Sequence, residues 1–240
     1  MAGHSHWANI KHKKAAIDAK RGKAWSKLVK AIMVAAKHGG PDPGANIGLR
    51  FAIIEAKGAN VPKDTIERAI KKGAGELGGA DFESIRYEGY GPSGVAVIVD
   101  ALTDNRARTA PDLRAIFSKY GGNLGATGCV GFMFEHKGVI AIEDGQINED
   151  RLMDLVIEAG AQDVQHEDGA WIVTTAPTEF LAVKDALDSA GVETASAELT
   201  LDPLNTVTVA AEDSVKIQKM IDALDDNEDV QKVYTNLDVQ

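Results

Sequence analysis

The residues suited to nucleophilic or acid–base catalysis form no recognisable catalytic set. Cys129 is the single cysteine, and as a nucleophile it would need a partner base, for which only His136 lies near in sequence. The alternative role for Cys129 is that of a small buried residue. Carboxylates are abundant but follow no spacing that isolates an acid–base pair. Neither pattern singles out a catalytic residue.

Glycine-rich, acidic and histidine-containing segments also lack the context that ligand binding requires. Residues 73–78 match the letters of the dinucleotide-binding fingerprint, but they follow a predicted helix instead of a strand, so we expect a linker. Residues 225–229 lack the central glycine and closing glutamate of a calcium loop, and we expect a solvated turn. After removal of Met1, the new amine and His4 could form a tetragonal copper or nickel site. Because no other His or Cys cluster has ligand spacing, we predict no metal and no cofactor.

Positive charge is concentrated in the first third of the chain. Residues 1–75 contain 15 Lys and Arg against 5 Asp and Glu, whereas residues 76–240 contain 11 against 31. This asymmetry predicts that one region meets a polyanion while the remainder repels it. Charge alone leaves one alternative open, which is a solvated helical bundle without a partner.

The lysines of this region lie on an N-terminal arm, residues 1–22, and on one helix face. Apolar residues from Trp25 to Ala36 recur with a period of 3.6, and the lysines between them point the opposite way. Such lysines can neutralise successive phosphates and release counterions. Aromatic residues for stacking on unpaired bases are nearly absent, which favours the backbone of a double-stranded DNA or a structured RNA. The main candidate contacts are Lys11, Lys13, Lys14, Lys20, Arg21, Lys23, Lys27 and Lys30, and the secondary ones are Lys63, Lys71 and Lys72.

Arg106 and Arg108 form a possible second anion site. They begin a predicted helix that Asp104 and Asn105 open, where cations oppose the helix dipole. The two arginines either bind an anion or pair with neighbouring acids, and the sequence leaves both accounts open.

The period of the apolar residues changes from 3.6 to 2 after the glycine-rich linker. Before it, helices predicted over 23–37, 47–57 and 62–72 make residues 1–75 an all-helical, basic domain with a flexible N-terminal arm. After it, strands and helices alternate. The predicted strands are 94–102, 130–135, 139–143, 163–167, 171–175, 193–201, 206–210 and 230–235, and the predicted helices are 106–120, 149–159, 178–190 and 213–224.

This order of elements predicts an α+β multidomain protein. Residues 137–202 read β-α-β-β-α-β, which is the ferredoxin-like order. Residues 80–136 and 203–240 give the same order when they are joined. We therefore expect an N-terminal all-helical domain followed by two ferredoxin-like domains, one of which is inserted in the other.

Two further features concern the compartment. The longest apolar runs are about five residues, against roughly 20 for a membrane-spanning helix, so we expect no membrane partner. The N-terminus has no apolar segment typical of a secretion signal, and a single cysteine cannot form an internal disulfide. Both features favour the cytoplasm.

Several long, ordered segments resemble signatures of the YebC/PmpR family. Together they span residues 1–136, and the remainder agrees with the family in element order. His6 stands where a lysine is common in the family, and Cys129 where a serine is common. The segments are AGHSHWANIKHKKAA at 2–16, DAKRGK at 18–23, ANVPKDTIERAIKKG at 59–73, YEGYGP at 87–92, LTDNR at 102–106 and GGNLG at 121–125.

The resemblance implies a three-domain, cytoplasmic, non-enzymatic regulator of gene expression. Bacterial members are described as DNA-binding transcriptional regulators. Mitochondrial relatives act as translational activators of cytochrome c oxidase, and bacterial members are also linked to relief of ribosome stalling. We therefore expect a DNA-binding transcriptional regulator. One alternative is a translation factor that binds the ribosome through ribosomal RNA, and a more remote one is a sensor that binds a metabolite between the two α+β domains.

Overall fold

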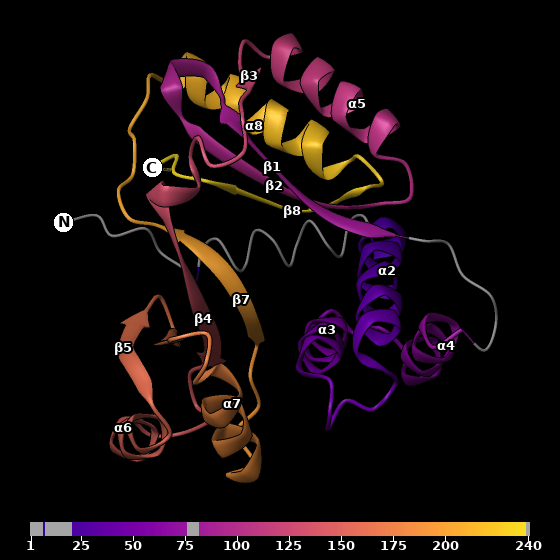
Figure 1. Cartoon of the computed structure of the whole chain (residues 1–240). Helices are drawn as coiled ribbons and strands as arrows, with labels where there is room; N and C mark the ends of the chain where they lie inside the picture. Colours follow the sequence, from indigo (N-terminus) through magenta and orange to yellow (C-terminus); the bar gives the residue numbers. More distant parts are fainter. Residues whose placement is uncertain (1–6, 8–20, 76–81, 239–240) are drawn as a thin grey trace.

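The computed structural model describes residue 7 and residues 21–75 and 82–238 of the 240-residue chain. Within these residues a helical part, residues 21–75, stands beside two four-stranded antiparallel sheets (Figure 1). An α+β protein with a helical N-terminal part was predicted, and this is confirmed. No helix among these residues is both long and apolar enough to cross a membrane.

The helical part contains α2 (Arg21–Gly39), α3 (Ile47–Gly58) and α4 (Lys63–Gly73), as the apolar period predicted. The Asn46 side chain caps α3 by accepting a hydrogen bond from the backbone N–H of Leu49 at 3.0 Å. Helices α2 and α4 pack closely, since a Cβ atom at Gly73 would lie 2.3 Å from the carbonyl oxygen of Met33. This core is self-contained, because the buried residues that form it all come from the helical part, namely Ile32, Ala36, Leu49, Ala52, Ala56, Val61, Ile66 and Ala69.

The first sheet is built from chain segments that precede and follow the second sheet in the sequence. Its strands are β1 (Glu83–Tyr90), β2 (Ala96–Thr103), β3 (Asn123–Leu124) and β8 (Val230–Thr235), in the order β3-β1-β2-β8. Helices α5 (Arg106–Lys119) and α8 (Ala211–Asp225) cover one face (Figure 1). Their side chains Phe117 and Met220 are fully buried against Val97 and Val99 of β2.

The second sheet has the order β5-β6-β4-β7. Its strands are β4 (Phe134–Glu143), β5 (Ala161–Glu167), β6 (Ala170–Thr175) and β7 (Ser196–Pro203), and helices α6 (Glu149–Glu158) and α7 (Phe180–Ser189) cover one face. The sequence of elements is therefore the predicted β-α-β-β-α-β. On the opposite face Trp7, 4% exposed, packs with Val139, Ala141, Ala170 and Ile172.

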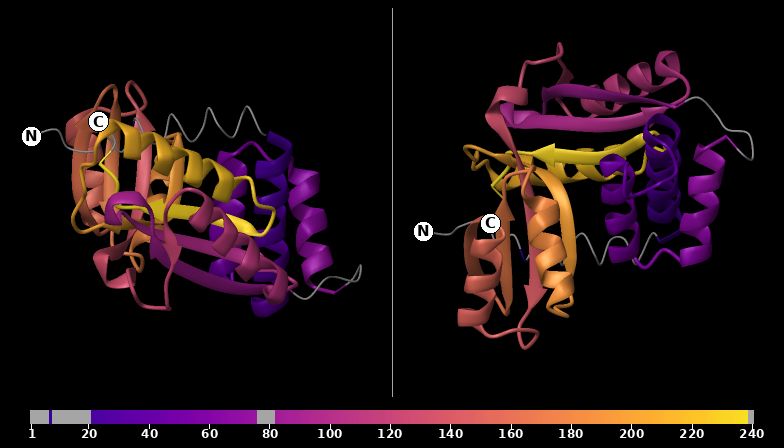
Figure 2. Two further views of the ribbon diagram at one scale, coloured as in Figure 1. Left: turned by 90° about the horizontal axis from the view of Figure 1, so that it is seen from above. Right: turned by 60° about the horizontal axis from the view of Figure 1, so that its bottom comes forward.

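Strands β4 and β7 form a long antiparallel pair that leads from the first sheet into the second. The pairing runs from Phe134 opposite Pro203 to Ala141 opposite Ser196, whereas β6 pairs only with the part of β4 from Gly138 to Glu143. Figure 2 shows the two strands running together away from the first sheet.

Two of the predicted strands were wrong, and strands β1 and β3 were not predicted. The segment 130–135 is a 3-10 turn at Gly131–Met133 followed by the start of β4, because Glu88 draws the backbone N–H groups of Val130 and Gly131 into a loop. The segment 206–210 makes only one bridge, between Val207 and Leu237. The first sheet is thus β-β-α-β before the second sheet and α-β after it, where β-α-β on each side was expected.

Candidate nucleic-acid interface

The lysine face of α2 lies against residues 225–229, between α8 and β8, which we call the acidic turn. Lys27 Nζ donates to the backbone carbonyl oxygen of Asp225 at 2.6 Å, and Lys30 Nζ donates to that of Glu228 at 2.9 Å. Lys23 Nζ lies 3.6 Å from a carboxylate oxygen of Asp226. The three lysines do share one face, as predicted. Asp225, Asp226 and Glu228 are exposed, as expected of a solvated turn, and the turn also contacts this face.

Lys30 is the most enclosed of the three lysines. Its side chain is 17% exposed, and Nζ lies 3.6 Å from Asp229 Oδ1 and 3.4 Å from the carbonyl oxygen of Leu102. The same ammonium sits 5.0 Å from the centroid of the Phe82 ring, within the range of a cation–π interaction.

Burial lowers the pKa of Lys27, and the negative charges of Asp225 and Asp226 offset only part of this effect.

Asp229 joins the acidic turn to α5. Its Oδ2 accepts hydrogen bonds from Arg108 at 2.9 Å, from Thr109 at 2.8 Å and from Thr103 at 3.2 Å. Burial by itself raises the pKa of Asp229, but the hydrogen bonds from Arg108 and Thr109 outweigh it, so the pKa lies below its ordinary value.

The two candidate arginines lie in the first turn of α5. Arg108 forms ion pairs with Asp229 at 2.9 Å and with Asp104 at 3.2 Å. It therefore pairs with neighbouring acids, which is one of the two roles that the sequence left open. Arg106 is exposed in the same turn. An anion site at this turn stays a prediction.

The secondary lysine candidates are exposed on α4. Lys63 has 88% of its side chain accessible and lies 3.8 Å from Glu67. Lys71 and Lys72 are exposed in the last turn of the helix, where positive charge complements the helix dipole. Lys72 also lines a hollow of about 260 Å³ whose other lining residues are Met33, Val34, Lys37, Gly73, Gly75 and Phe82.

Other candidates lie outside the described residues. They are the N-terminal arm with Lys11, Lys13, Lys14 and Lys20, the side chain of Arg21, the His4 site and part of the glycine-rich linker.

The surroundings of Cys129 oppose its use as a nucleophile. Burial raises the pKa of the thiol, and the nearby Glu88 carboxylate raises it further. The side chain is half-buried, and its backbone carbonyl accepts a hydrogen bond from the Tyr90 hydroxyl at 3.0 Å. In the part of the chain that the structure describes, no group of three or more His, Cys, Asp or Glu side chains could hold a metal ion.

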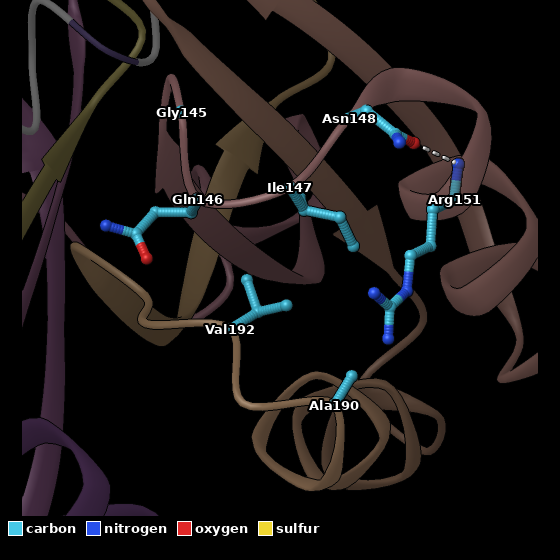
Figure 3. A pocket seen from close by; sticks show the side chains of 7 residues that line it. All are labelled: Gly145, Gln146, Ile147, Asn148, Arg151, Ala190 and Val192. Carbon is cyan, nitrogen blue, oxygen red and sulfur yellow. Dashed lines mark hydrogen bonds between the residues drawn. The ribbon is translucent and has the colours of Figure 1, made fainter.

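A second hollow, of about 450 Å³, lies in the second-sheet unit (Figure 3). Its lining residues are Gly145, Gln146, Ile147, Asn148, Arg151, Ala190 and Val192. Figure 3 shows the Arg151 side chain extending toward Ala190, while Asn148 accepts a hydrogen bond from the Arg151 backbone N–H at 2.9 Å. None of these lining residues is an acid, a histidine or a cysteine. The hollow lies within one sheet unit and not between the two, where a metabolite sensor was expected to bind.

Sequence reasoning missed two charged residues that organise this arrangement. Glu88 of β1 accepts hydrogen bonds from the backbone N–H groups of Gly128, Val130 and Gly131 at 2.9, 2.8 and 2.7 Å. Lys232 of β8 forms ion pairs with α3 and β7. A charged residue within an apolar strand is a signal for Lys232, whereas Glu88 had none because β1 was not predicted.

Two family models together match nearly the whole chain. The TACO1/YebC protein N-terminal domain matches residues 5–76, and the TACO1/YebC second and third domain matches residues 82–237. The chain belongs to the TACO1/YebC family. The expected resemblance is thereby confirmed.

Relatives within the YebC family are similar over their full length. A probable transcriptional regulatory protein of Nitrosospira multiformis is 55% identical over 236 residues, covering 98% of each chain. Another, from Thermoanaerobacter pseudethanolicus, is 52% identical over 241 residues, covering 100% of this chain and 98% of the relative. The crystal structure of a conserved hypothetical protein from Aquifex aeolicus has a TM-score of 0.84 at 49% identity, covering 98% of both chains. The names of the family and of the curated relatives describe regulatory proteins rather than enzymes.

Proposed function

We propose that this YebC-family protein is a transcriptional regulator that binds duplex DNA through the cationic surface of its helical part. The observation that carries the proposal is the exposure of Lys63, Lys71 and Lys72 in the only third of the chain with an excess of positive charge. The names of the curated relatives support the regulatory role.

In this proposal the lysines act on the phosphate backbone and not on the bases. Each ammonium that neutralises a phosphate releases a condensed counterion, which makes the binding strong at low salt and largely independent of sequence. The exposed lysines of α4 and the lysines and arginine of the N-terminal arm make these contacts. Lys23, Lys27 and Lys30 add to this surface only when α2 separates from the acidic turn that contacts them. The negatively charged sheets keep the duplex on the side of the helical part, because like charges repel.

The test is the salt dependence of binding to a fluorescently labelled duplex, followed by anisotropy. If about six phosphates are neutralised, log affinity falls with log salt at a slope near −5. The variant K63Q/K71Q/K72Q loses three contacts, so its slope is expected to be shallower by about 2 to 3. A slope near zero for the wild type overturns the electrostatic account.

A matched control removes three exposed lysines from the first-sheet helices, in the variant K119Q/K216Q/K219Q. Its net charge equals that of the α4 variant, so we expect the wild-type slope. An equal loss in both variants would mean that overall charge matters instead of the α4 surface. A duplex RNA of the same sequence is measured in parallel, and clearly tighter binding to RNA would overturn the DNA assignment in favour of structured RNA such as that of the ribosome.

A further inference from the structure

Oxygen atoms of the acidic turn hold the lysine face of α2. Lys27 and Lys30 donate to backbone carbonyls at 2.6 and 2.9 Å, and Lys23 lies 3.6 Å from a carboxylate. The phosphate backbone of a nucleic-acid duplex likewise presents a row of negatively charged oxygen acceptors. A duplex and the acidic turn therefore require the same ammonium groups.

We propose that the acidic turn is an intramolecular competitor of nucleic acid for the α2 lysines. A duplex engages Lys27 and Lys30 only when the helical part swings away from the first sheet. The proposal rests on the proposed function. Because the turn is part of the same chain, its effective concentration is high, and the closed arrangement weakens binding without any added partner.

The two contact surfaces of the helical part differ in a way that permits this movement. On the α2 side the contacts with the acidic turn are ionic or polar and are made by long lysine side chains. On the α3 side the rings of Phe51 and Phe180 pack 5.6 Å apart, and the ion pairs Glu55–Lys232 and Arg50–Asp185 flank this apolar contact. Rotation about the α3 contact separates α2 from the turn and leaves apolar burial in place.

Separation at α2 also leaves the hydrophobic cores intact. The core of the helical part contains only its own residues, and the core of the first sheet contains none of them. Opening therefore exposes the lysines, Phe82 and the acidic turn, most of which are polar groups that water solvates well.

The first experiment compares duplex affinity in the wild type and in the variant D225N/D226N/E228Q. These three acids are exposed, and Asp229 is kept because it holds Arg108. The matched control D150N/D154N/E158Q removes three exposed acids from α6. At about 0.1 M salt, charges more than about 10 Å from the bound duplex are largely screened. We expect the turn variant to bind the duplex about fivefold or more tightly than the control, which is the low end of typical coupling between sites.

The second experiment measures opening directly, in a protein with the native turn. Cysteines introduced at Glu67 on α4 and Gln218 on α8, in a C129S background, carry a donor and an acceptor dye. We expect the energy-transfer efficiency to change when the labelled protein is saturated with duplex DNA. A smaller change in the same direction is expected without DNA when the acids of the turn are replaced, because that variant removes the carboxylates but keeps the backbone carbonyl acceptors of Lys27 and Lys30.

The possible failures of the two proposals are distinguishable. If neither the wild type nor the turn variant binds the duplex, the proposed function is overturned. If both bind it as tightly as the α6 control does, with constant transfer efficiency, the competition is overturned and the proposed function stands. Tighter binding by the turn variant together with a change in transfer supports the competition.

Discussion

Lys232 Nζ on β8 lies 2.5 Å from Glu55 Oε1 on α3 and 3.2 Å from Glu198 Oε2 on β7. One ammonium group thus connects the helical part to both sheets. Burial lowers the pKa of Lys232, but the two carboxylates outweigh it and raise the pKa above its ordinary value. The lysine is therefore charged throughout the physiological range, and its charge compensates two acids that would otherwise repel each other.

Replacing Lys232 with methionine is expected to lower the free energy of unfolding by about 3 kcal/mol, because it removes the ammonium group that compensates two largely buried carboxylates. Urea unfolding of the wild type and the variant measures the difference. The triple variant K232M/E55Q/E198Q removes all three charges and is expected to recover most of the loss. A triple variant as unstable as K232M would show that packing, and not charge, determines the effect.

Asp229 gives a prediction for acid stability. Its pKa lies below the ordinary value of 3.8, so the stabilisation that it provides is present above about pH 4 and is lost as the pH falls through the native pKa. The variant D229N loses charge-assisted hydrogen bonds worth about 2 kcal/mol at pH 7. The difference from the wild type is expected to shrink below pH 4 in urea titrations. The control D112N alters an exposed acid of α5, and we expect it to be as stable as the wild type at pH 7.

Glu88 is expected to fix the loop from Gly125 to Gly131. Burial raises the pKa of Glu88, but hydrogen bonds from the three backbone N–H groups outweigh it, and the pKa lies below its ordinary value. The variant E88Q places an amide donor against these donors and is expected to cost about 2 kcal/mol. Hydrogen exchange is expected to speed up at the amides of residues 128, 130 and 131. Unchanged exchange there would contradict the anchoring role.

Two helix glycines give opposite predictions for substitution by alanine. In G73A the new Cβ would clash with the Met33 carbonyl, and we expect a loss of about 2 kcal/mol from overpacking. In G22A nothing lies within 4 Å of the new Cβ, so better helix propensity is expected to add about 0.5 kcal/mol. Thermal unfolding distinguishes the two variants, and equal effects would contradict the close α2–α4 packing.

Local patterns in the sequence predicted the elements that bury their own apolar faces. The stripe from Trp25 to Ala36 gave α2, and the apolar run near Val97 gave β2. Strand β1 could not be found in this way, because its inward polar groups are satisfied by distant partners. Arg86 pairs with Asp100 at 2.7 Å, and the backbone partners of Glu88 lie 40, 42 and 43 positions further along the chain.

The candidate site was predictable only in part for a similar reason. Helical geometry placed Lys23, Lys27 and Lys30 on one face, and the structure agrees. What faces these lysines depends on how the units pack, since Lys27 and its acceptor Asp225 are 198 positions apart. The period of a helix shows which side is polar, but not which surface lies opposite.

The paired path of β4 and β7 into the second sheet has a mechanical consequence. Two antiparallel strands joined by hydrogen bonds from Phe134 and Pro203 onward resist bending and twisting more than two separate linkers do. The chain crosses from the helical part to the first sheet only once, at residues 76–82. Under thermal agitation or an applied load, the second sheet is thus expected to move with the first as one stiff body, and the helical part to be displaced first.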